Sequence, residues 1–406
     1  MAGAADSTIR YLRSPQAVRE RCEAVFEFVH SGQSRHFRLD LSRLPGARDF
    51  TWQVMRESYP DPALIPSHSR VQHFRVGGID RLGRFEASLV EPRERARALT
   101  ELIVTSVLLD AGAGNSWSFT EPDTGVRCGR SEGLALASLH CFLGGTLSSQ
   151  AASPWQADAA GLAALSAEKL GQAFQVREDN PLVGLEGRAA LLRRLGEVLS
   201  APLFCGLGRV GGLCDALVAR ASAGRLPAAE VLGVVLEALG PIWPARTQCL
   251  GVELGDVWFH AAAGGEGPSQ GLVPFHKLSQ WLSYSLIHPL AAAGVEVVER
   301  EALTGLAEYR NGGLFIDTGV IVPQHEAVTH ALYPASSELV VEWRALTVAL
   351  LDRLADGLRQ VMGLDAVSLP LGKVLEAGSW AAGRRLAGEL RHGASPITVQ
   401  SDGTLF

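Results

Sequence analysis

The 406-residue sequence lacks the features on which several common classes of protein depend. It has 37 basic and 43 acidic residues, so its formal net charge of −6 gives no basic field for holding a nucleic-acid backbone. No run of about 18 mostly apolar residues occurs, because the uncharged stretch 278–295 is interrupted by Ser, Gln, His and Pro. We therefore expect neither a nucleic-acid partner nor a membrane span.

Cysteine is sparse, and the N-terminus lacks the basic start and apolar stretch of a secretory signal. The six cysteines form no CxxC pair, which argues against a disulfide framework and a zinc cage. We expect a cytoplasmic protein with reduced, mostly structural cysteines.

Familiar catalytic motifs are also missing. His325 and His330 are five residues apart, whereas the two histidines of a zincin helix are four apart and share a helical face. The glycine-rich stretch 206–212 has the spacing of neither a dinucleotide fingerprint nor a P-loop, and no Gly-x-Ser-x-Gly elbow occurs. We predict no metal and no cofactor.

What the sequence does contain is Ala- and Leu-rich helical periodicity, and 47% of its residues are hydrophobic. The predicted helices cover residues 96–109, 185–199, 227–239, 273–293 and 338–361. The fold class is therefore mainly α, with small β ribbons.

Shorter segments favour strands or loops. Strands are predicted at residues 36–41, 314–322 and 397–406, the last with a hairpin turn at Ser401-Asp402-Gly403. The stretches 148–164 and 261–271 are predicted as loops or boundaries. We expect residues 1–72 to form an appendage and residues 73–406 a helical catalytic body, and the alternative is one continuous domain that includes the N-terminus.

The densest polar chemistry lies at residues 274–281 and 303–313. Lys277 and Arg310 could hold an anionic group, while Glu308 could stabilise a developing cation on the same substrate. A turn or helix end would explain Asn311-Gly312-Gly313, but not the charged residues around it.

Further polar segments allow both functional and structural interpretations. The loop after Asp110, with Asn115 and Trp117, could bind a flat polar group, although an Asp and glycines also commonly end a helix. Arg130 and Glu132 stand just before a predicted helix, where an anion or a helix cap would fit. Charges at 342 and 344 inside an apolar helix favour a structural ion pair over catalysis.

These segments together resemble a known family. The matching motifs are residues 110–115, 129–133, 181–188, 274–280, 308–313, 342–344, 378–384 and 401–404. They are similar to the uracil-catabolism protein four family, over a region from about residue 73 to the C-terminus. The resemblance implies a role in the reductase-independent uracil pathway, in which the ring of uracil nucleotide is opened toward a ribosylurea phosphate and urea is released later.

A more distant resemblance is to the queuosine-nucleotide N-glycosidases. It implies a helical body akin to the helix-hairpin-helix DNA glycosylases, and cleavage of a ribose–base bond in a 5′-monophosphate. By this match Glu308 is the catalytic carboxylate, and Lys277 and Arg310 bind the sugar phosphate. Our sequence has Glu where the relative has Asp, and Asn-Gly-Gly where it has Val-Pro-Gln, which changes the reach of the acid and the shape of the base pocket.

Both lines lead to the same expectation, a metal-independent N-glycosidase that converts ribosylurea 5-phosphate to urea and ribose 5-phosphate. Glu308 would act on the oxocarbenium-like state, and Asp110 or Glu132 would protonate the leaving group, with Asp317 a weaker candidate. The expected substrate-binding residues are Lys277, Arg310, Tyr309, Asn115, Trp117, Arg130, Asp317 and Gln280.

Two other functions stay open at this point. One is an amidohydrolase or lyase acting on the ureido group of the same intermediate. The other is a noncatalytic protein that binds a nucleotide intermediate. The expected partner in each case is a small phosphorylated ribose-urea or nucleotide, and the sequence permits self-association without requiring it.

Overall fold

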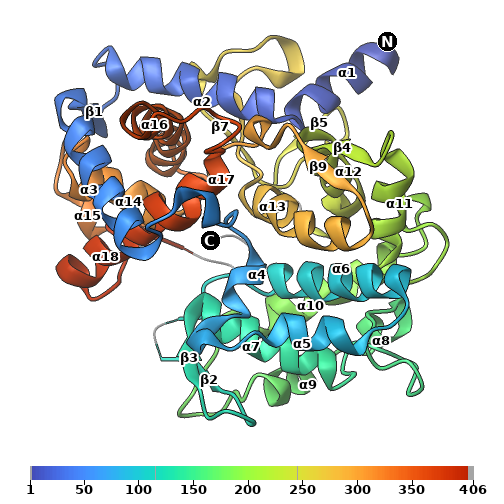
Figure 1. Ribbon diagram of the computed structural model, residues 1–406. Coiled ribbons are helices and arrows are strands. Elements are labelled where there is room, and N and C mark those ends of the chain that lie inside the picture. The colour runs from blue at the N-terminus through green and yellow to red at the C-terminus, as the bar shows by residue number, and fades with distance from the viewer. Residues whose placement is uncertain (1, 115, 245, 401–406) are drawn as a thin grey trace. The chain divides into compact units, whose positions relative to one another are not determined.

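The computed structural model describes residues 2–114, 116–244 and 246–400, and this part of the chain is mainly helical with short pairs of strands (Figure 1). The predicted fold class is confirmed. No helix in these ranges is long and apolar enough to cross a membrane. All six cysteines are free, and four of them are buried.

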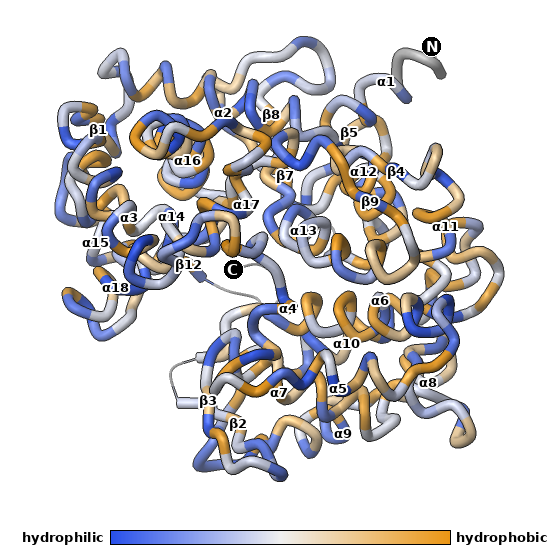
Figure 2. Tube along the Cα trace, viewed as in Figure 1, coloured by the Kyte–Doolittle hydropathy of each residue, from blue (hydrophilic) through white to orange (hydrophobic). Residues whose placement is uncertain are grey.

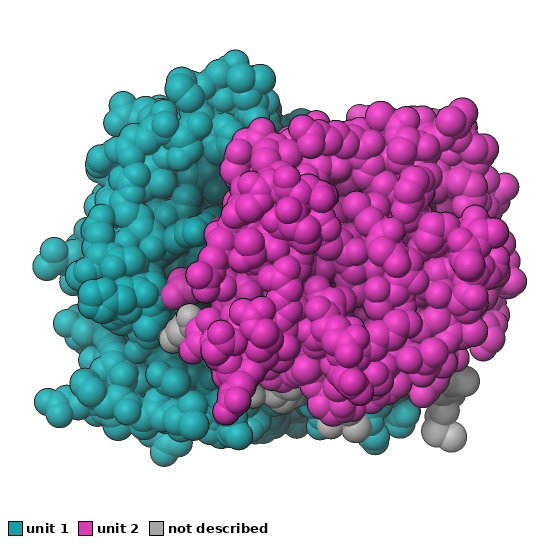
Figure 3. Space-filling model, turned by 90° about the horizontal axis from the view of Figure 1, so that it is seen from below, with its two compact units in different colours: residues 1–68, 245–280, 299–400 teal, residues 69–244, 281–298, 401–406 magenta. Residues whose placement is uncertain are grey.

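The chain forms two compact units, each built from separate stretches of sequence (Figure 3). Among the described residues, unit 1 is drawn from 2–68, 246–280 and 299–400, and unit 2 from 69–114, 116–244 and 281–298. Helix α13 (Lys277–Ala292) contributes residues to both units. The expected division between residues 72 and 73 stays a prediction.

Unit 1 holds the following helices and strands besides the start of α13. They are α1 (Ala2–Leu12), α2 (Pro15–His30), β1 (Phe37–Leu39), α3 (Leu44–Ser58), β5 (Gln248–Cys249), β6 (Val252–Glu253), β7 (Val257–Phe259), β8 (Leu272–Pro274), α14 (Tyr309–Asp317), β10 (Ile321–Pro323), α15 (Ala327–His330), β11 (Leu332–Tyr333), α16 (Glu338–Met362), α17 (Leu371–Lys373), the π-helix η9 (Val374–Ser379), α18 (Trp380–Arg391) and β12 (Thr398–Val399).

The long helix α16 is the centre of unit 1. Its start is capped by the Ser337 side chain, which accepts from the Val340 N–H, and it ends at Gly363, whose φ of +66° suits glycine. Helix α2 packs against α16, and apolar residues alternate with polar ones along its trace in Figure 2. Helices α3 and α14 also contact α16, so the segment that carries Glu308 rests on this core.

The structure corrects the prediction of a strand at 314–322. Residues up to Asp317 belong to helix α14, and only Ile321–Pro323 form a strand, β10, which pairs antiparallel with β1. The apolar run Leu314-Phe315-Ile316 is compatible with a strand, but α14 is fixed as a helix by its tertiary contacts with α16 and α18. Asn311-Gly312-Gly313 lies in the first turns of this helix and does not end one.

Unit 2 contains the end of α13 and a second set of elements. They are α4 (Arg70–His73), α5 (Arg81–Ser88), α6 (Pro92–Leu108), β2 (Ser118–Thr120), β3 (Arg127–Gly129), α7 (Arg130–Leu143), α8 (Ala159–Ala163), α9 (Ala167–Ala173), α10 (Leu185–Val198), α11 (Gly212–Arg220), β4 (Arg225–Pro227), α12 (Ala228–Leu239) and β9 (Glu296–Val298).

Helix α6 is the buried helix of unit 2. Glu91 caps its start by accepting from the Arg93 and Glu94 N–H groups, and nearly every residue from Ala96 to Leu108 is buried. Its one fully buried carboxylate, Glu101, is paired with Arg209 at 2.6 Å and also accepts the Gly211 N–H. Helices α7, α10 and α11 contact α6 and complete the core of this unit.

The five predicted helices are all present, as α6, α10, α12, α13 and α16. The strand expected at 36–41 is present as β1, and the tail contributes β12, which pairs in parallel with β11. The hairpin turn expected at 401–403 lies outside the described residues. The loop expected at 148–164 is interrupted by helix α8, which Asp158 caps, whereas the stretch 261–271 contains only short 3-10 turns and bends before β8 begins.

Candidate functional site

Glu308 stands at the N-terminus of helix α14 and is 8% exposed. One carboxylate oxygen accepts the Arg310 N–H at 2.9 Å, and the other accepts the Asn311 N–H at 2.6 Å. Glu308 is therefore the N-cap of the helix. Both of these donors are backbone N–H groups at the positive end of the helix dipole, a position that favours a carboxylate.

Arg310 and Tyr309 lie directly beside this carboxylate. The Arg310 Nε donates to the Tyr309 hydroxyl at 3.0 Å, and the guanidinium carbon lies 4.8 Å from the ring centroid of Trp380. Arg384 lies over the same indole at 5.3 Å. The carboxyl side chain that caps α14 is thus followed, two residues later, by a guanidinium held against aromatic rings.

A buried ion pair supports the backbone around these residues. Arg344 binds Asp256 through two parallel contacts of 2.7 and 2.8 Å, and its Nε donates to the carbonyl of Ala307 at 3.3 Å. Asp256 also accepts the Lys277 N–H at 3.0 Å. The Arg344–Asp256 pair therefore holds both Ala307, the residue before Glu308, and Lys277, the first residue of α13. These contacts support the expectation that Arg344 belongs to a structural ion pair.

Burial alone would raise the pKa of Asp256. The positive charge of Arg344 and the hydrogen bonds from Arg344, from Trp258 and from the Lys277 backbone outweigh that effect. They hold the pKa of the Asp256 carboxyl well below its usual range. The pair is consequently ionised throughout the neutral pH range.

Lys277 and Gln280 occupy the first turn of α13. The Lys277 side chain is half-buried, at a helix N-terminus where positive charge and backbone N–H groups favour anions. Gln280 is fully buried, and its Nε2 donates to the Thr304 hydroxyl at 2.6 Å. This bond ties α13 to the segment that leads to Glu308, and a direct contact of Gln280 with substrate stays a prediction.

Asp317, at the opposite end of α14, is engaged by a guanidinium. Its two oxygens lie 2.6 and 2.7 Å from the two terminal nitrogens of Arg391, and its side chain is 3% exposed. A carboxylate in such a fork is neutralised by its partner. The Asp317–Arg391 contact gives Asp317 a structural role. A part for Asp317 in proton transfer or substrate binding stays a prediction.

In unit 2, Asp110 forms a buried ion pair. Its Oδ1 lies 2.8 Å from Arg70 Nη2, and its Oδ2 accepts from the Ser131 hydroxyl at 3.1 Å. Arg70 is fully buried and also donates to the carbonyls of Ser106 and Ser131. Burial lowers the pKa of Arg70, and the charge of Asp110 opposes that shift.

The loop that follows Asp110 is held from helix α10. Arg188 is fully buried, and its guanidinium donates to the carbonyls of Leu109, Ala111 (2.7 Å) and Gly112 (2.8 Å). These bonds satisfy carbonyl groups at and beyond the C-terminus of α6. Asn115 lies outside the described residues.

The other candidates of unit 2 lie around helix α7. Trp117 is buried, stacks on Phe174 at 6.1 Å and donates to the Phe174 carbonyl at 3.0 Å. Arg130 opens α7 with a φ of +53°, a left-handed conformation that non-glycine residues seldom adopt. Glu132 is in the first turn of α7, and its charge, like that of Asp110, partly opposes the burial that lowers the pKa of Arg70. Substrate contacts of these residues stay predictions.

A comparison with family models and curated proteins now defines the relationship of the chain. Residues 11–406 match a family described as "Protein of unknown function (DUF1688)". The chain belongs to this family. It is 41% identical to "Protein urg3" of Schizosaccharomyces pombe, over 98% of our chain and 99% of the relative. It is 36% identical to "Uracil catabolism protein 4" of Lachancea kluyveri, over 99% of each chain.

The described part of this family member has one group that could hold a metal ion: His260, Glu338 and Glu342. The His260 Nδ1 accepts the Ala262 N–H at 3.1 Å, so the ring proton sits on Nε2, which donates to Glu342 at 3.2 Å. A metal on Nε2 would require the proton at Nδ1, where the Ala262 N–H already points. The geometry fits a hydrogen bond better than a ligand set, and the absence of a metal stays a prediction.

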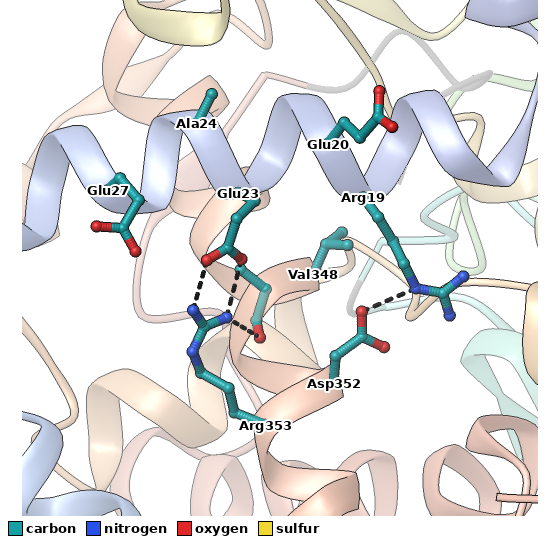
Figure 4. Close-up of a pocket in the computed structure, with 9 residues that line it drawn as sticks. Arg19, Glu20, Glu23, Ala24, Glu27, Val348, Asp352 and Arg353 are labelled. Carbon is teal, nitrogen blue, oxygen red and sulfur yellow. Dashed lines mark hydrogen bonds and ion pairs between the residues drawn. The ribbon is translucent and has the colours of Figure 1, made fainter.

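A pocket of about 520 Å³ opens between α2 and α16, and none of the residues discussed above lines it (Figure 4). Two ion pairs cross it: Glu23 with Arg353 at 2.5 Å, and Arg19 with Asp352 at 3.0 Å. Arg19 also donates to the carbonyls of residues 301–303. These contacts join the two helices, and the pocket contains no predicted site residue.

The sequence pattern missed three residues of unit 1 that form contacts between distant segments. Asp256 lies 88 positions before Arg344. His68 pairs with Glu376, 308 positions away, through Nδ1 and Oε2 at 2.6 Å. No local spacing connects such partners. The motif at 342–344 includes Arg344, the partner of Asp256, but none of the family motifs includes any of the three missed residues.

Proposed function

We propose that this protein acts in uracil catabolism as an N-glycosidase that hydrolyses ribosylurea 5-phosphate to urea and ribose 5-phosphate. The pathway is supported by the 36% identical relative, which is named for uracil catabolism and matches along nearly its whole length. The reaction is supported by one observation above all. A buried carboxylate, Glu308, accepts two backbone N–H groups at the N-terminus of α14, and Arg310 follows it two residues later.

In the proposed reaction the C1′–N bond breaks, and its electron pair stays on the urea nitrogen, which takes up a proton. The sugar passes through an oxocarbenium-like state, whose positive charge the Glu308 carboxylate stabilises. Water adds its oxygen to C1′ and gives its proton to the same carboxylate. Atoms and charge balance, with one water consumed for each bond broken.

Binding of the 5-phosphate is assigned to Arg310 and Lys277. Arg310 offers a rigid guanidinium fork, and Lys277 adds a point charge at the start of α13. Asp110, Glu132, Trp117, Arg130 and Asn115 remain further candidates for contact with the substrate.

The test is incubation of the purified protein with ribosylurea 5-phosphate, uridine monophosphate and queuosine monophosphate, followed by mass spectrometry of the products. Urea and ribose 5-phosphate from the first substrate alone are the expected result. Ammonia and carbon dioxide in place of urea would make the protein an amidohydrolase of the ureido group. Tight binding without turnover would make it a binding protein.

A further inference from the structure

Asn311 is a fully buried residue in the first turn of α14, three positions after Glu308. Its backbone N–H donates to the Glu308 carboxylate at 2.6 Å and so belongs to the cap of the helix. Its side chain forms two further hydrogen bonds with other parts of unit 1, and capping requires neither of them. The Asn311 side chain therefore has a task of its own beside that of its backbone.

The side-chain amide of Asn311 bridges the segment before Glu308 and the π-helix η9. Its Nδ2 donates to the Leu306 carbonyl at 3.1 Å, and its Oδ1 accepts from the Ser379 hydroxyl at 2.8 Å. A carbonyl can only accept, so the amide nitrogen must face Leu306 and the amide oxygen must face Ser379. Ser379 is fully buried and is the last residue of η9, and π-turns inserted in helices occur often at functional sites. Both ends of the amide are thus engaged, in one orientation.

The Leu306 carbonyl fixes the backbone that carries Glu308. It accepts the Glu308 N–H at 2.9 Å and also the Asn311 amide, so two donors close a tight turn over residues 306–308. The Glu308 carbonyl in turn accepts the Gly312 N–H at 3.0 Å. The backbone and the carboxylate of Glu308 are therefore both held by groups between residues 306 and 312.

Close packing leaves this segment little room to move. A methyl group on Gly383 of α18 would lie 2.1 Å from the Arg310 carbonyl oxygen, so α18 packs directly against the backbone of α14. A methyl group on Gly305 would lie 2.6 Å from the Leu351 side chain of α16. Hydrogen-bonded polar groups in a close-packed core favour one arrangement over all others. The Glu308 carboxylate is therefore held in place before a substrate binds.

We propose that Asn311 is the positioning residue of Glu308 and that Ser379 acts through it. This inference rests on the proposed N-glycosidase reaction, in which the Glu308 carboxylate must face the positive charge that develops at C1′. A charged group stabilises such a state best when it is already in place, because moving it during the reaction costs free energy. We assign Asn311 no contact with the substrate and no proton transfer.

Side-chain truncation tests the assignment. Asn311→Ala removes both side-chain hydrogen bonds and keeps the backbone N–H that caps the helix. We expect kcat on ribosylurea 5-phosphate to fall about 10–100-fold and KM to change less than about 2-fold, because the substrate still binds while the carboxylate is misplaced. Ser379→Ala removes one hydroxyl and should lower kcat to a smaller extent. The double variant should lose no more than Asn311→Ala alone, since Ser379 acts through Asn311.

The matched control is Thr318→Ala at the other end of α14. It also removes a side-chain hydrogen bond, from Thr318 Oγ1 to the Leu314 carbonyl at 2.7 Å, and it should leave kcat and KM unchanged. Chemical unfolding of every variant separates loss of fold from loss of chemistry. Where Asn311→Ala does not fold, the smaller change Ser379→Ala decides the test.

The outcomes distinguish this inference from the reaction on which it rests. Wild-type kcat in folded Asn311→Ala, or an equal fall in kcat in Thr318→Ala, would overturn the role of Asn311 and leave the N-glycosidase reaction intact. Losses that multiply in the double variant would show that Ser379 does not act through Asn311. A wild-type protein that releases no urea from ribosylurea 5-phosphate would overturn both the reaction and the inference. A fall in kcat at constant KM, with no added loss in the double variant, establishes Asn311 as the positioning residue.

Discussion

The two ends of helix α14 carry buried carboxylates with opposite surroundings. Glu308 at the start accepts hydrogen bonds from two backbone N–H groups, whereas Asp317 at the end is bound by both terminal nitrogens of Arg391. The first carboxylate accepts hydrogen bonds from neutral backbone groups. The second forms a neutral pair. Only the first is suited to stabilise a cation on a substrate.

This comparison shows that burial and residue type do not identify a catalytic acid. Both side chains are nearly inaccessible, with Glu308 8% and Asp317 3% exposed. The two carboxylates differ in the charge of the groups that bind them, and the neighbouring sequence does not reveal which groups these are. The predictions below test this distinction, beginning with the largest expected effect.

Glu308→Gln should lower kcat on ribosylurea 5-phosphate on the order of 10³-fold with little change in KM, because the amide cannot stabilise a cation or accept the proton of water. Steady-state kinetics checks this. The variant also loses part of the helix cap, at about 1 kcal/mol, so chemical unfolding should accompany the kinetics. Normal turnover in a folded variant would remove Glu308 from the mechanism.

Asp256→Asn should destabilise the protein by about 3–5 kcal/mol, because Arg344 would remain buried without its counter-charge. The folded pKa of Asp256 lies below its usual value near 4, so the pair contributes stability above that pH and loses it only as the pH falls through the acid range. Urea unfolding should therefore give the same loss at pH 6 and pH 8. A loss that varies between these values would contradict the assigned ionisation.

The position of Glu308 also depends on how closely α14 packs against α16. A methyl group on Gly312 would meet Thr347 Oγ1 and Trp343 Nε1 at 2.7 Å, so Gly312→Ala should cost about 1–3 kcal/mol. It should also lower activity by moving Glu308. The control is Gly388→Ala in α18, where a methyl group meets nothing within 4 Å and should have a neutral or stabilising effect. Equal unfolding midpoints for the two variants would contradict the close packing.

Asp317→Asn should have the smallest effect. Arg391 is 24% exposed and can turn toward water, so we expect a loss of about 1 kcal/mol in unfolding and an unchanged kcat. Parallel kinetics with Glu308→Gln checks the contrast. A large fall in kcat with normal stability would move the catalytic role to the other end of the helix.

Much of the fold could be predicted because apolar periodicity is a local signal. The long helices α6, α10, α12, α13 and α16 repeat Leu, Val and Ala at helical spacing, and each was found near its expected bounds. Helix α14 was missed because its first turns contain two glycines and its end is rich in β-forming residues. Its packing against α16, which requires a glycine at 312, outweighs those preferences.

The candidate site was predictable only where its residues are neighbours in sequence. Glu308, Tyr309 and Arg310 form one motif, and the structure keeps them together. Asp256 with Arg344, and His68 with Glu376, are contacts between distant segments, so no spacing rule could pair them. The same limit applies to Asp317, whose neutralisation by Arg391 depends on the C-terminal helix α18.

The most direct test of the account is binding of a cationic transition-state mimic, an iminoribitol 5-phosphate whose protonated ring nitrogen carries the charge of the oxocarbenium ion. Isothermal titration calorimetry should show that the wild-type protein binds it about 10²-fold or more tightly than ribose 5-phosphate. We expect Glu308→Gln to lose this preference and Asp317→Asn to keep it. An equal preference in wild type and Glu308→Gln would contradict the assignment of Glu308 as the cation-stabilising carboxylate.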